Sequence, residues 1–259
     1  MIVLEGIGRD FDTPAGARYC AVDGISLEIA SGAFCAIVGP SGCGKTTLLN
    51  LIAGLLAPSR GRVAIDAVDL AGLNARATYL FQQDALLPWK NVRENVALGL
   101  TLAGAPRRDA LGRADEWLAR VGLQAFGDHF PAQLSGGMRK RAAMAQHWIL
   151  DRDIVLMDEP FSALDVHTRN RMESELLGLW EGSGKTVVFV THDLEEAIAL
   201  ADEVVVLSAG PASRNVSAHR IDLERPRDLF ELRTAPAFLD LYASIWADLR
   251  DEVRRSQKA

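Results

Sequence analysis

Residues 39–47 read Gly-Pro-Ser-Gly-Cys-Gly-Lys-Thr-Thr, and this stretch decides the fold. It fits the pattern G-x-x-x-x-G-K-[ST], in which a glycine-rich loop lets backbone N–H groups converge on nucleotide phosphates. An apolar run, 34–38, precedes it, and an amphipathic run, 47–53, follows it. Phosphate binding requires that strand–loop–helix setting, because the helix N-terminus adds a partial positive charge. The stretch therefore predicts a site for a nucleoside triphosphate.

The residues of this phosphate loop have distinct expected roles. Lys45 would reach the β- and γ-phosphates, and the Thr46 hydroxyl would ligate Mg²⁺. Cys43 is interpreted as a small residue tolerated in the loop and not as a redox group. The expected phosphate-binding residues are Gly39, Pro40, Ser41, Gly42, Cys43, Gly44, Lys45, Thr46 and Thr47.

Composition narrows the class of protein. The 259 residues are 49% hydrophobic, enough for a sizeable core, and the net charge of -6 argues against a nucleic-acid partner. Three cysteines without CxxC spacing argue against a disulfide framework or a zinc site and favour a reducing cytoplasm. The sequence shows neither a secretory signal nor an apolar run of membrane-spanning length. Any work at a membrane is therefore expected to go through a partner.

The rest of the chain alternates between strand and helix patterns. Strands are predicted at 2–7, 25–29, 34–38, 62–66, 77–81, 154–157, 186–190 and 204–207. Strands alternating with helices imply an α/β fold with a mostly parallel sheet. We predict one domain over 1–259, with a helical subdomain at about 90–150 and a helical, charged tail at about 225–259.

Two carboxylates close an apolar strand, in the run Ile-Val-Leu-Met-Asp-Glu at 154–159. Beside a phosphate loop, Asp158 is expected to hold Mg²⁺ through water. Glu159 would point at the γ-phosphate and orient or deprotonate the attacking water. An ionised pair at a strand end needs a nearby cation, and Mg²⁺ with Lys45 would supply it.

A second candidate anion site is the signature segment, residues 134–138, which reads Leu-Ser-Gly-Gly-Met. Ser135 fits the N-cap of a helix, and it also fits a phosphate site with the Gly136 and Gly137 amides, so both roles can hold. By contrast, Gly-Ser-Gly-Lys at 182–185 is interpreted as a turn. Leu179 stands where a phosphate loop needs its first glycine, and this stretch precedes a strand.

The order of these motifs resembles the ATP-binding subunits of ABC transporters over essentially the whole chain. The ordered motifs are the phosphate loop, Gln82, 134–137, 157–160, 162–165 and 191–193. The resemblance implies a P-loop nucleoside triphosphatase core with an N-terminal antiparallel β region. It also implies a head-to-tail dimer of two copies, in which each ATP lies between one phosphate loop and the other copy's Ser135, Gly136 and Gly137.

The resemblance also implies roles for single residues. Gln82 would touch Mg²⁺ and the attacking water, His192 would contact the γ-phosphate, and Asp165 would link the two subunits. Phe11 would stack on the adenine of ATP. Tyr19 is a rival for that role, because residues 12–18 leave the alignment open, and core packing is the alternative for either ring.

Two departures from the family pattern leave hydrolysis expected. Thr46 replaces the commoner serine and keeps the hydroxyl, whereas Met138 replaces a glutamine and loses one side-chain hydrogen bond.

The segment 86–95, with Leu-Leu-Pro-Trp at 86–89, and the run 134–141 look similar to importers of nitrate, sulfonate, taurine and related solutes. Trp89 would then face a membrane permease, the alternative being packing inside the helical subdomain. A periplasmic or lipid-anchored solute-binding protein would be an indirect partner, and the chain would lie on the cytoplasmic face of the inner membrane. The alternative function is a soluble ABC-type ATPase in repair, translation or cofactor assembly.

Overall fold

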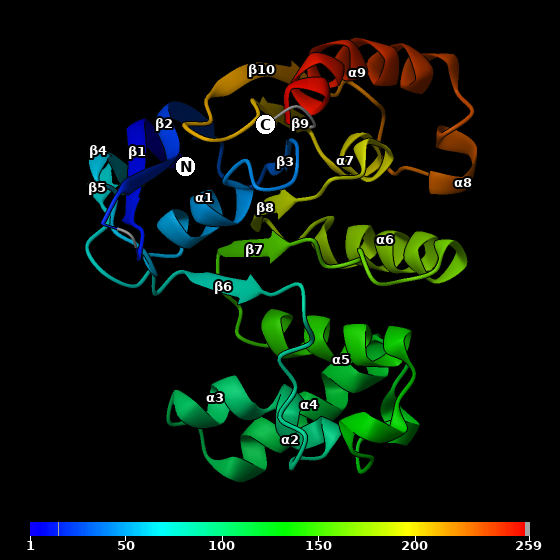
Figure 1. Ribbon diagram of the computed structural model, residues 1–259. Coiled ribbons are helices and arrows are strands. Elements are labelled where there is room, and N and C mark those ends of the chain that lie inside the picture. Colours follow the sequence, from blue (N-terminus) through cyan, green and yellow to red (C-terminus); the bar gives the residue numbers. More distant parts are fainter. Residues whose placement is uncertain (15, 257–259) are drawn as a thin grey trace.

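A computed structural model describes residues 1–14 and 16–256, and these form two sheets and a separate group of helices (Figure 1). The strands are β1 Ile2–Asp12, β2 Arg18–Ile29, β3 Phe34–Val38, β4 Arg60–Ile65, β5 Val68–Asp69, β6 Ala77–Leu80, β7 Ile154–Asp158, β8 Thr186–Val190, β9 Glu203–Leu207 and β10 Asn215–Arg220. The helices are α1 Lys45–Ile52, α2 Val92–Val96, α3 Leu98–Leu102, α4 Arg107–Arg120, α5 Gly136–Trp148, α6 Val166–Trp180, α7 Leu194–Leu200, α8 Leu229–Leu232 and α9 Pro236–Ser256, with 3₁₀ turns at Gln124–Phe126 and Pro131–Gln133.

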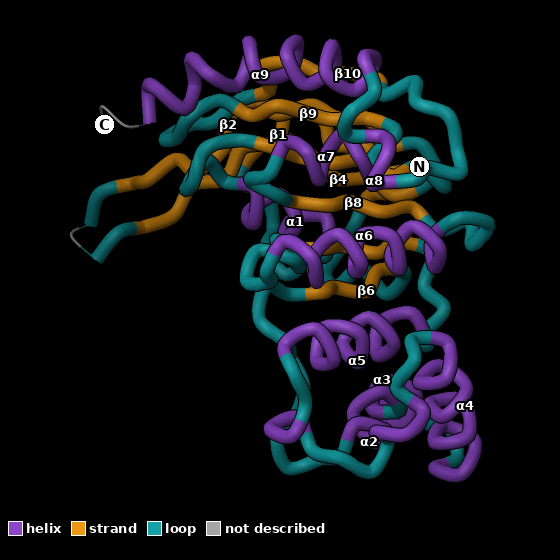
Figure 2. The backbone as a smooth tube through the Cα atoms, turned by 90° about the vertical axis from the view of Figure 1, so that its right-hand side faces the viewer, coloured by secondary structure: helices purple, strands orange, loops and turns teal. Residues whose placement is uncertain are grey.

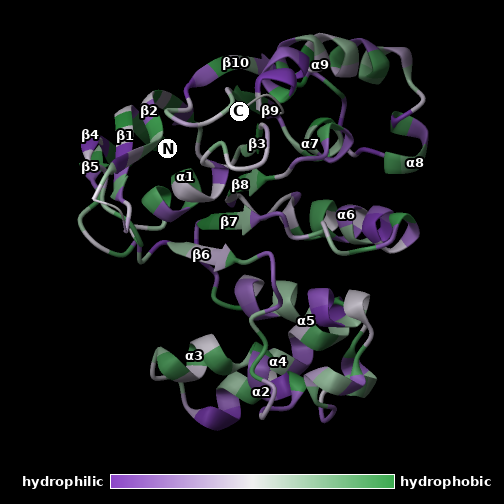
Figure 3. Cartoon of the chain, viewed as in Figure 1, coloured by the Kyte–Doolittle hydropathy of each residue, from purple (hydrophilic) through white to green (hydrophobic). Residues whose placement is uncertain are grey.

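The central sheet has six strands in the order β10-β9-β3-β8-β7-β6. From β9 to β6 all neighbours are parallel, and β10 pairs with β9 antiparallel. β3, β7 and β8 are buried along their whole length, as expected of parallel strands covered on both faces, and β7 and β8 are hydrophobic in Figure 3. The predicted mostly parallel sheet is confirmed.

The second sheet is antiparallel, in the order β2-β1-β4-β5, which confirms the expected N-terminal region. Its hairpin of β1 and β2 is longer than predicted, because the predicted strands 2–7 and 25–29 cover only the apolar parts. The outer halves are partly exposed and polar, and they are held by cross-strand pairing such as Phe11 with Tyr19. This hairpin extends beyond the rest of the sheet (Figure 2).

The two faces of the central sheet belong to different cores, because alternate residues of a strand point to opposite sides. Phe34, Ala36 and Val38 of β3 join the cluster that packs against α5, α6, α7 and α9. Cys35 and Ile37 join the cluster that contains α1 and the antiparallel sheet. α1 is therefore held between the two sheets, with its N-terminus at the carboxyl ends of the parallel strands.

A third core belongs to the helices between β6 and β7, which lie below the sheet in Figure 1. It gathers apolar residues of α2, α4 and α5, among them Val96, Leu118 and Ala145. Leu86 and Leu134 close it at the two chain segments that lead to and from the central sheet. The group is thus built around its own buried residues, and α5 faces both this core and the sheet.

The last predicted segment, 225–259, contains α8 and α9, and residues 257–259 lie outside the described residues. Phe238, Ile245 and Leu249 of α9 are buried against the core beside α7 and β9. Among residues 1–14 and 16–256, no helix combines the length and apolarity that crossing a membrane requires.

His147, near the end of α5, gives the fold a measurable pH dependence. Its Nδ1 lies 2.7 Å from Thr78 Oγ1, and its Nε2 is shut off from solvent without a hydrogen-bond partner in the described residues. Burial lowers the pKa of His147 from 6.5 to about 4. Between pH 6.5 and about 4, His147 is protonated in the unfolded chain but neutral in the folded chain. The stability that neutral His147 allows is therefore fully present above pH 6.5 and is lost as the pH falls toward 4.

We expect His147→Gln, which keeps an acceptor for Thr78, to make the unfolding free energy depend less on pH. The wild-type minus variant difference in unfolding free energy should fall by about 1.4 kcal/mol per pH unit below pH 6. Denaturant unfolding at pH 7.5, 6 and 5 measures it. Parallel pH dependences for the two proteins would rule out a neutral, buried His147.

Candidate ATP-binding site

The phosphate loop joins the end of β3 to the start of α1 and closes around a lysine. Lys45 is buried, and its Nζ donates hydrogen bonds to the carbonyl oxygens of Gly39 (2.8 Å) and Pro40 (3.0 Å). Gly42 and Gly44 have φ angles of 76° and 91°, a region that favours glycine. A Cβ at Gly44 would also lie 2.6 Å from Val22 Cγ1. The chain therefore needs these glycines to turn its amides inward.

Cys43 fills the interior of this loop. The side chain is buried, and its Sγ would lie 2.8 Å from a Cβ placed on Gly39, so thiol and glycine are packed directly together. Burial raises the pKa of the Cys43 thiol, more than the nearby Lys45 lowers it. A protonated, enclosed thiol is a poor nucleophile, which supports the packing interpretation over a redox one.

Thr46 and Asp158, the predicted magnesium ligands, meet at the mouth of the loop. Thr46 Oγ1 donates to Asp158 Oδ1 at 3.1 Å, and Tyr79 Oη donates to Asp158 Oδ2 at 3.3 Å. Burial raises the pKa of Asp158, although these two hydroxyls act against the rise. A buried carboxylate beside a hydroxyl is an oxygen donor set that suits Mg²⁺, which would also offset the burial of the charge. Sequence reasoning missed Tyr79, because an aromatic residue in a strand carries no separate signal.

Glu159 and His192 follow neighbouring strands, β7 and β8, and contact each other. His192 Nδ1 lies 3.0 Å from Glu159 Oε2. Glu159 has a φ of 45°, which is rare for a residue with a side chain, and its N–H donates to the Val190 carbonyl at 2.9 Å. The backbone is thus held in a strained turn, as is common where chemistry occurs, and Glu159 borders the same cavity as the phosphate loop.

Glu159 lines a cavity of about 280 Å³ that is open to solvent. The other lining residues come from the phosphate loop and the hairpin, and they are Phe11, Tyr19, Ala21, Ser41, Gly42, Gly44, Lys45, Thr46 and Thr47. Both candidate adenine-stacking rings therefore border the cavity. The Arg9 guanidinium lies 4.7 Å from the centre of the Phe11 ring, so one face of that ring is already covered.

Gln82 lies in the loop after β6 and reaches the turn after β7. Its Nε2 donates to Ser162 Oγ at 3.4 Å, and Ser162 Oγ donates to the Glu159 carbonyl at 3.0 Å. Gln82 is thus brought to the backbone of Glu159 through Ser162. It is not one of the residues that line the phosphate-loop cavity.

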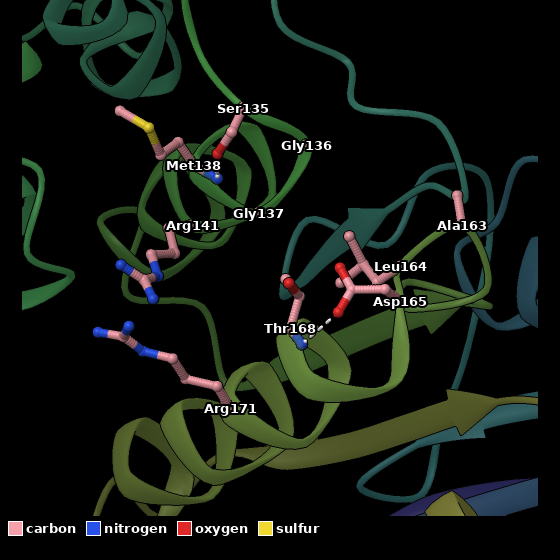
Figure 4. A pocket seen from close by; sticks show the side chains of 10 residues that line it. All are labelled: Ser135, Gly136, Gly137, Met138, Arg141, Ala163, Leu164, Asp165, Thr168 and Arg171. Carbon is pink, nitrogen blue, oxygen red and sulfur yellow. Dashed lines mark hydrogen bonds between the residues drawn. The ribbon is translucent and has the colours of Figure 1, made fainter.

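The signature segment lies at a second cavity, of about 440 Å³, and among residues 1–14 and 16–256 the two cavities share no lining residue. Ser135 caps α5 by accepting a hydrogen bond from the Met138 N–H at 3.3 Å, which confirms its predicted N-cap role. Asp165 caps α6 by accepting from the Thr168 N–H at 3.0 Å. Figure 4 shows the two helix starts facing each other across the cavity.

Positive groups border this second cavity, and the Asp165 carboxylate lines it as well. Two helix N-termini contribute partial positive charge, and the guanidinium groups of Arg141 and Arg171 lie at its edge (Figure 4). Glu175 holds both of them, at 2.9 Å and 3.1 Å. One chain therefore carries two candidate phosphate-binding elements, each at its own cavity.

Two further predictions have a clear outcome. Trp89 has 71% of its surface exposed, so the alternative that it packs inside the helical subdomain is wrong. The stretch 182–185 lies in the turn that leads into β8, as predicted, with φ angles of 74° at Gly182 and 70° at Gly184.

Comparisons with known proteins agree with this geometry. The model of the ABC transporter family matches residues 22–162. An uncharacterized ABC transporter ATP-binding protein of Methanocaldococcus jannaschii is 47% identical over 94% of this chain and 89% of its own length. The taurine import ATP-binding protein TauB of Yersinia pestis is 48% identical over 74% of this chain and 75% of its own length.

Among solved structures, a dimeric ATP-binding cassette in a post-hydrolysis state, bound to ADP and Pi, is similar with a TM-score of 0.75. It is 31% identical, and the match covers 86% of this chain and 100% of that one. The family match, the two relatives and this fold agree with the ordered motifs of the sequence. The chain belongs to the ABC transporter family, as an ATP-binding subunit that hydrolyses ATP.

Proposed function

We propose that this chain powers a membrane importer for nitrate, sulfonate, taurine or a related small solute. The observation that carries the proposal is the pair of separate cavities, one with Lys45 and Glu159 and one with Ser135. Each supplies only part of a nucleotide site, and two copies arranged head to tail would complete both. The taurine import relative supports an importer over a soluble ATPase in repair, translation or cofactor assembly.

In this mechanism ATP binding closes the dimer and hydrolysis reopens it. Thr46 and Asp158, with Gln82, would hold Mg²⁺, which neutralises charge on the phosphates. Lys45 would leave its carbonyl partners for the β- and γ-phosphates. Glu159 would accept the proton of the attacking water, and His192 would contact the γ-phosphate while orienting that carboxylate.

The partner copy would add Ser135, Gly136 and Gly137 to the far side of the same phosphates. Asp165, across the cavity from Ser135, would link the two copies. Trp89, exposed beside the loop of Gln82, would meet a membrane permease and bring the chain to the cytoplasmic face of the membrane. A solute-binding protein would deliver the solute to that permease from the other side.

Solute uptake tests this proposal. Cells that lack this chain should lose uptake of labelled taurine, nitrate or an alkyl sulfonate. Wild-type protein should restore it, and Lys45→Ala, expressed to the same level, should not. Unchanged uptake of all three solutes, together with affinity purification from membranes that recovers no membrane-spanning subunit, would refute the importer.

Substitution of the two cavity aromatics decides which one stacks on adenine. We expect Phe11→Ala to weaken ATP binding about 10-fold, because base–aromatic stacking contributes about 1–3 kcal/mol. Tyr19→Ala, its cross-strand neighbour, is the matched control and should change the dissociation constant less than about twofold, within the spread of surface substitutions. Calorimetric titration with ATP measures both. The opposite ranking would move the stacking role to Tyr19.

A further inference from the structure

Lys140 is a charged residue that the fold buries. It lies on α5, five positions after Ser135, and only 4% of its surface is exposed. Its Nζ lies 2.9 Å from Asp84 Oδ1 and donates a hydrogen bond to the Gln82 backbone carbonyl at 2.7 Å. A buried ammonium is costly unless it is paired and hydrogen-bonded. These contacts therefore fix the loop after β6 to α5, the helix that begins within the signature segment.

A second cation tightens the same connection. Arg139 Nε lies 3.4 Å from Asp84 Oδ2, and Arg139 Nη1 donates to the Leu134 carbonyl at 2.7 Å. Asp84 is thus held by two consecutive residues in the first part of α5. Since Leu134 directly precedes Ser135, the contacts reach the turn that borders the second cavity.

The other end of this loop reaches the hydrolytic carboxylate. The Gln82 side chain donates to Ser162 Oγ, which donates to the Glu159 carbonyl. A continuous series of contacts therefore runs from Glu159, through Gln82 and Lys140, to the signature segment. Glu159 follows a strand of the central sheet, whereas α5 also packs in the core of the helical group. The series connects the two parts of the chain.

We propose that Lys140, paired with Asp84, is a positioning residue that couples the signature segment to Gln82 and Glu159. The proposal rests on the proposed function, in which these elements serve two different ATP molecules of a dimer. Lys140 lines neither cavity, so it acts through the loop. Ordering of one nucleotide site then orders the other, and the loss of Lys140 lowers the rate of hydrolysis without weakening ATP binding at the chain's own phosphate loop.

Lys185 provides a matched control in the same chain. It is 7% exposed, its Nζ lies 2.9 Å from Asp151 Oδ1, and it donates to the Arg152 carbonyl at 2.8 Å. Both lysines thus combine a carboxylate with a backbone carbonyl. Lys185 precedes β8, at the end of the sheet opposite His192, so its pairing stabilises the fold without touching the ATP sites.

The experiment compares Lys140→Met with Lys185→Met in the purified full chain. Both should lower the melting temperature. Lys140→Met should reduce kcat about 10-fold or more and leave KM and the ATP dissociation constant within about twofold, since misplacing a reacting group costs rate. Lys185→Met should retain kcat, and Lys140→Arg should recover most of the activity. Equal kcat values for the two methionine variants would overturn the proposal.

A double-mutant cycle supplies the second test. Because Asp84 pairs with Lys140, combining Asp84→Asn with Lys140→Met should lower kcat by clearly less than the product of the two single effects, whereas independent roles would multiply. If Lys140→Met does not fold, Lys140→Gln replaces it and keeps a donor for the Gln82 carbonyl. A normal rate in that folded variant would also overturn the proposal. A normal rate for Glu159→Gln would instead refute the hydrolytic role on which the proposal rests.

Discussion

Replacing Glu159 by Gln should lower kcat about 100-fold or more, which is the scale on which a positioned general base contributes. The amide has the size of the carboxylate and can still contact His192, whose Nδ1 lies 3.0 Å from Glu159 Oε2. It cannot take the proton of an attacking water at neutral pH. ATP binding at Lys45 and Thr46 should remain, so ATP should accumulate in a closed dimer that does not turn over.

The measurement combines steady-state hydrolysis with size-exclusion chromatography in the presence of ATP. Glu195→Gln is the control, because Glu195 follows His192 closely but its side chain is 54% exposed and pairs at 3.6 Å with Arg233. It should hydrolyse ATP at a rate within about twofold of the wild type, as expected of an exposed substitution. A Glu159→Gln variant that hydrolysed ATP normally, or remained monomeric with ATP, would remove Glu159 from the proposed role.

Gly136→Asp, in the cavity at the signature segment, should strongly reduce ATP hydrolysis. Gly136 is the first residue of α5 and lines the second cavity, and a Cβ there would have no neighbour closer than 3.9 Å. The new carboxylate therefore fits within its own chain, and an acid in the first turn favours the helix. Facing the phosphates bound by a partner, it should lower kcat about 100-fold, since juxtaposed like charges cost several kcal/mol.

Gly136→Ala separates charge from size, because its methyl group occupies the same open space. It should keep most of the activity, and both variants should bind ATP with wild-type affinity at their own phosphate loop. Gly137 is less suitable, since a Cβ there would lie 2.9 Å from Thr168 Cγ2 and disturb the start of α6. A Gly136→Asp variant that lost ATP binding in the monomer would contradict the claim that Gly136 lies outside the chain's own phosphate-loop site.

Local sequence was sufficient to predict the parts of the fold that carry strong patterns. β3, β7 and β8 are short apolar runs, and each was predicted within a residue or two of its observed bounds. The phosphate loop was predictable from its glycines, two of which have the positive φ that the turn needs. Ser135 was predicted as an N-cap from its position before a helix, and it is one.

Elements that depend on tertiary contacts escaped prediction. β10 alternates between exposed and half-buried residues at a sheet edge, and the outer part of the hairpin owes its form to pairing across the strands. The contacts of Tyr79 with Asp158 and of Lys140 with Asp84 form only in the folded chain. Such contacts join residues tens of positions apart, and a single sequence carries no local trace of them.

The central claim is that each ATP site is built from two copies of this chain, and a mixing experiment tests it most directly. Lys45→Ala lacks a working phosphate loop but has an intact signature segment, and Gly136→Asp has the reverse. Each variant alone should be inactive, whereas a head-to-tail heterodimer of the two contains one complete site. The account predicts that the mixture hydrolyses ATP well above the sum of the separate variants. A mixture no more active than that sum, with both variants folded and able to associate, would contradict it.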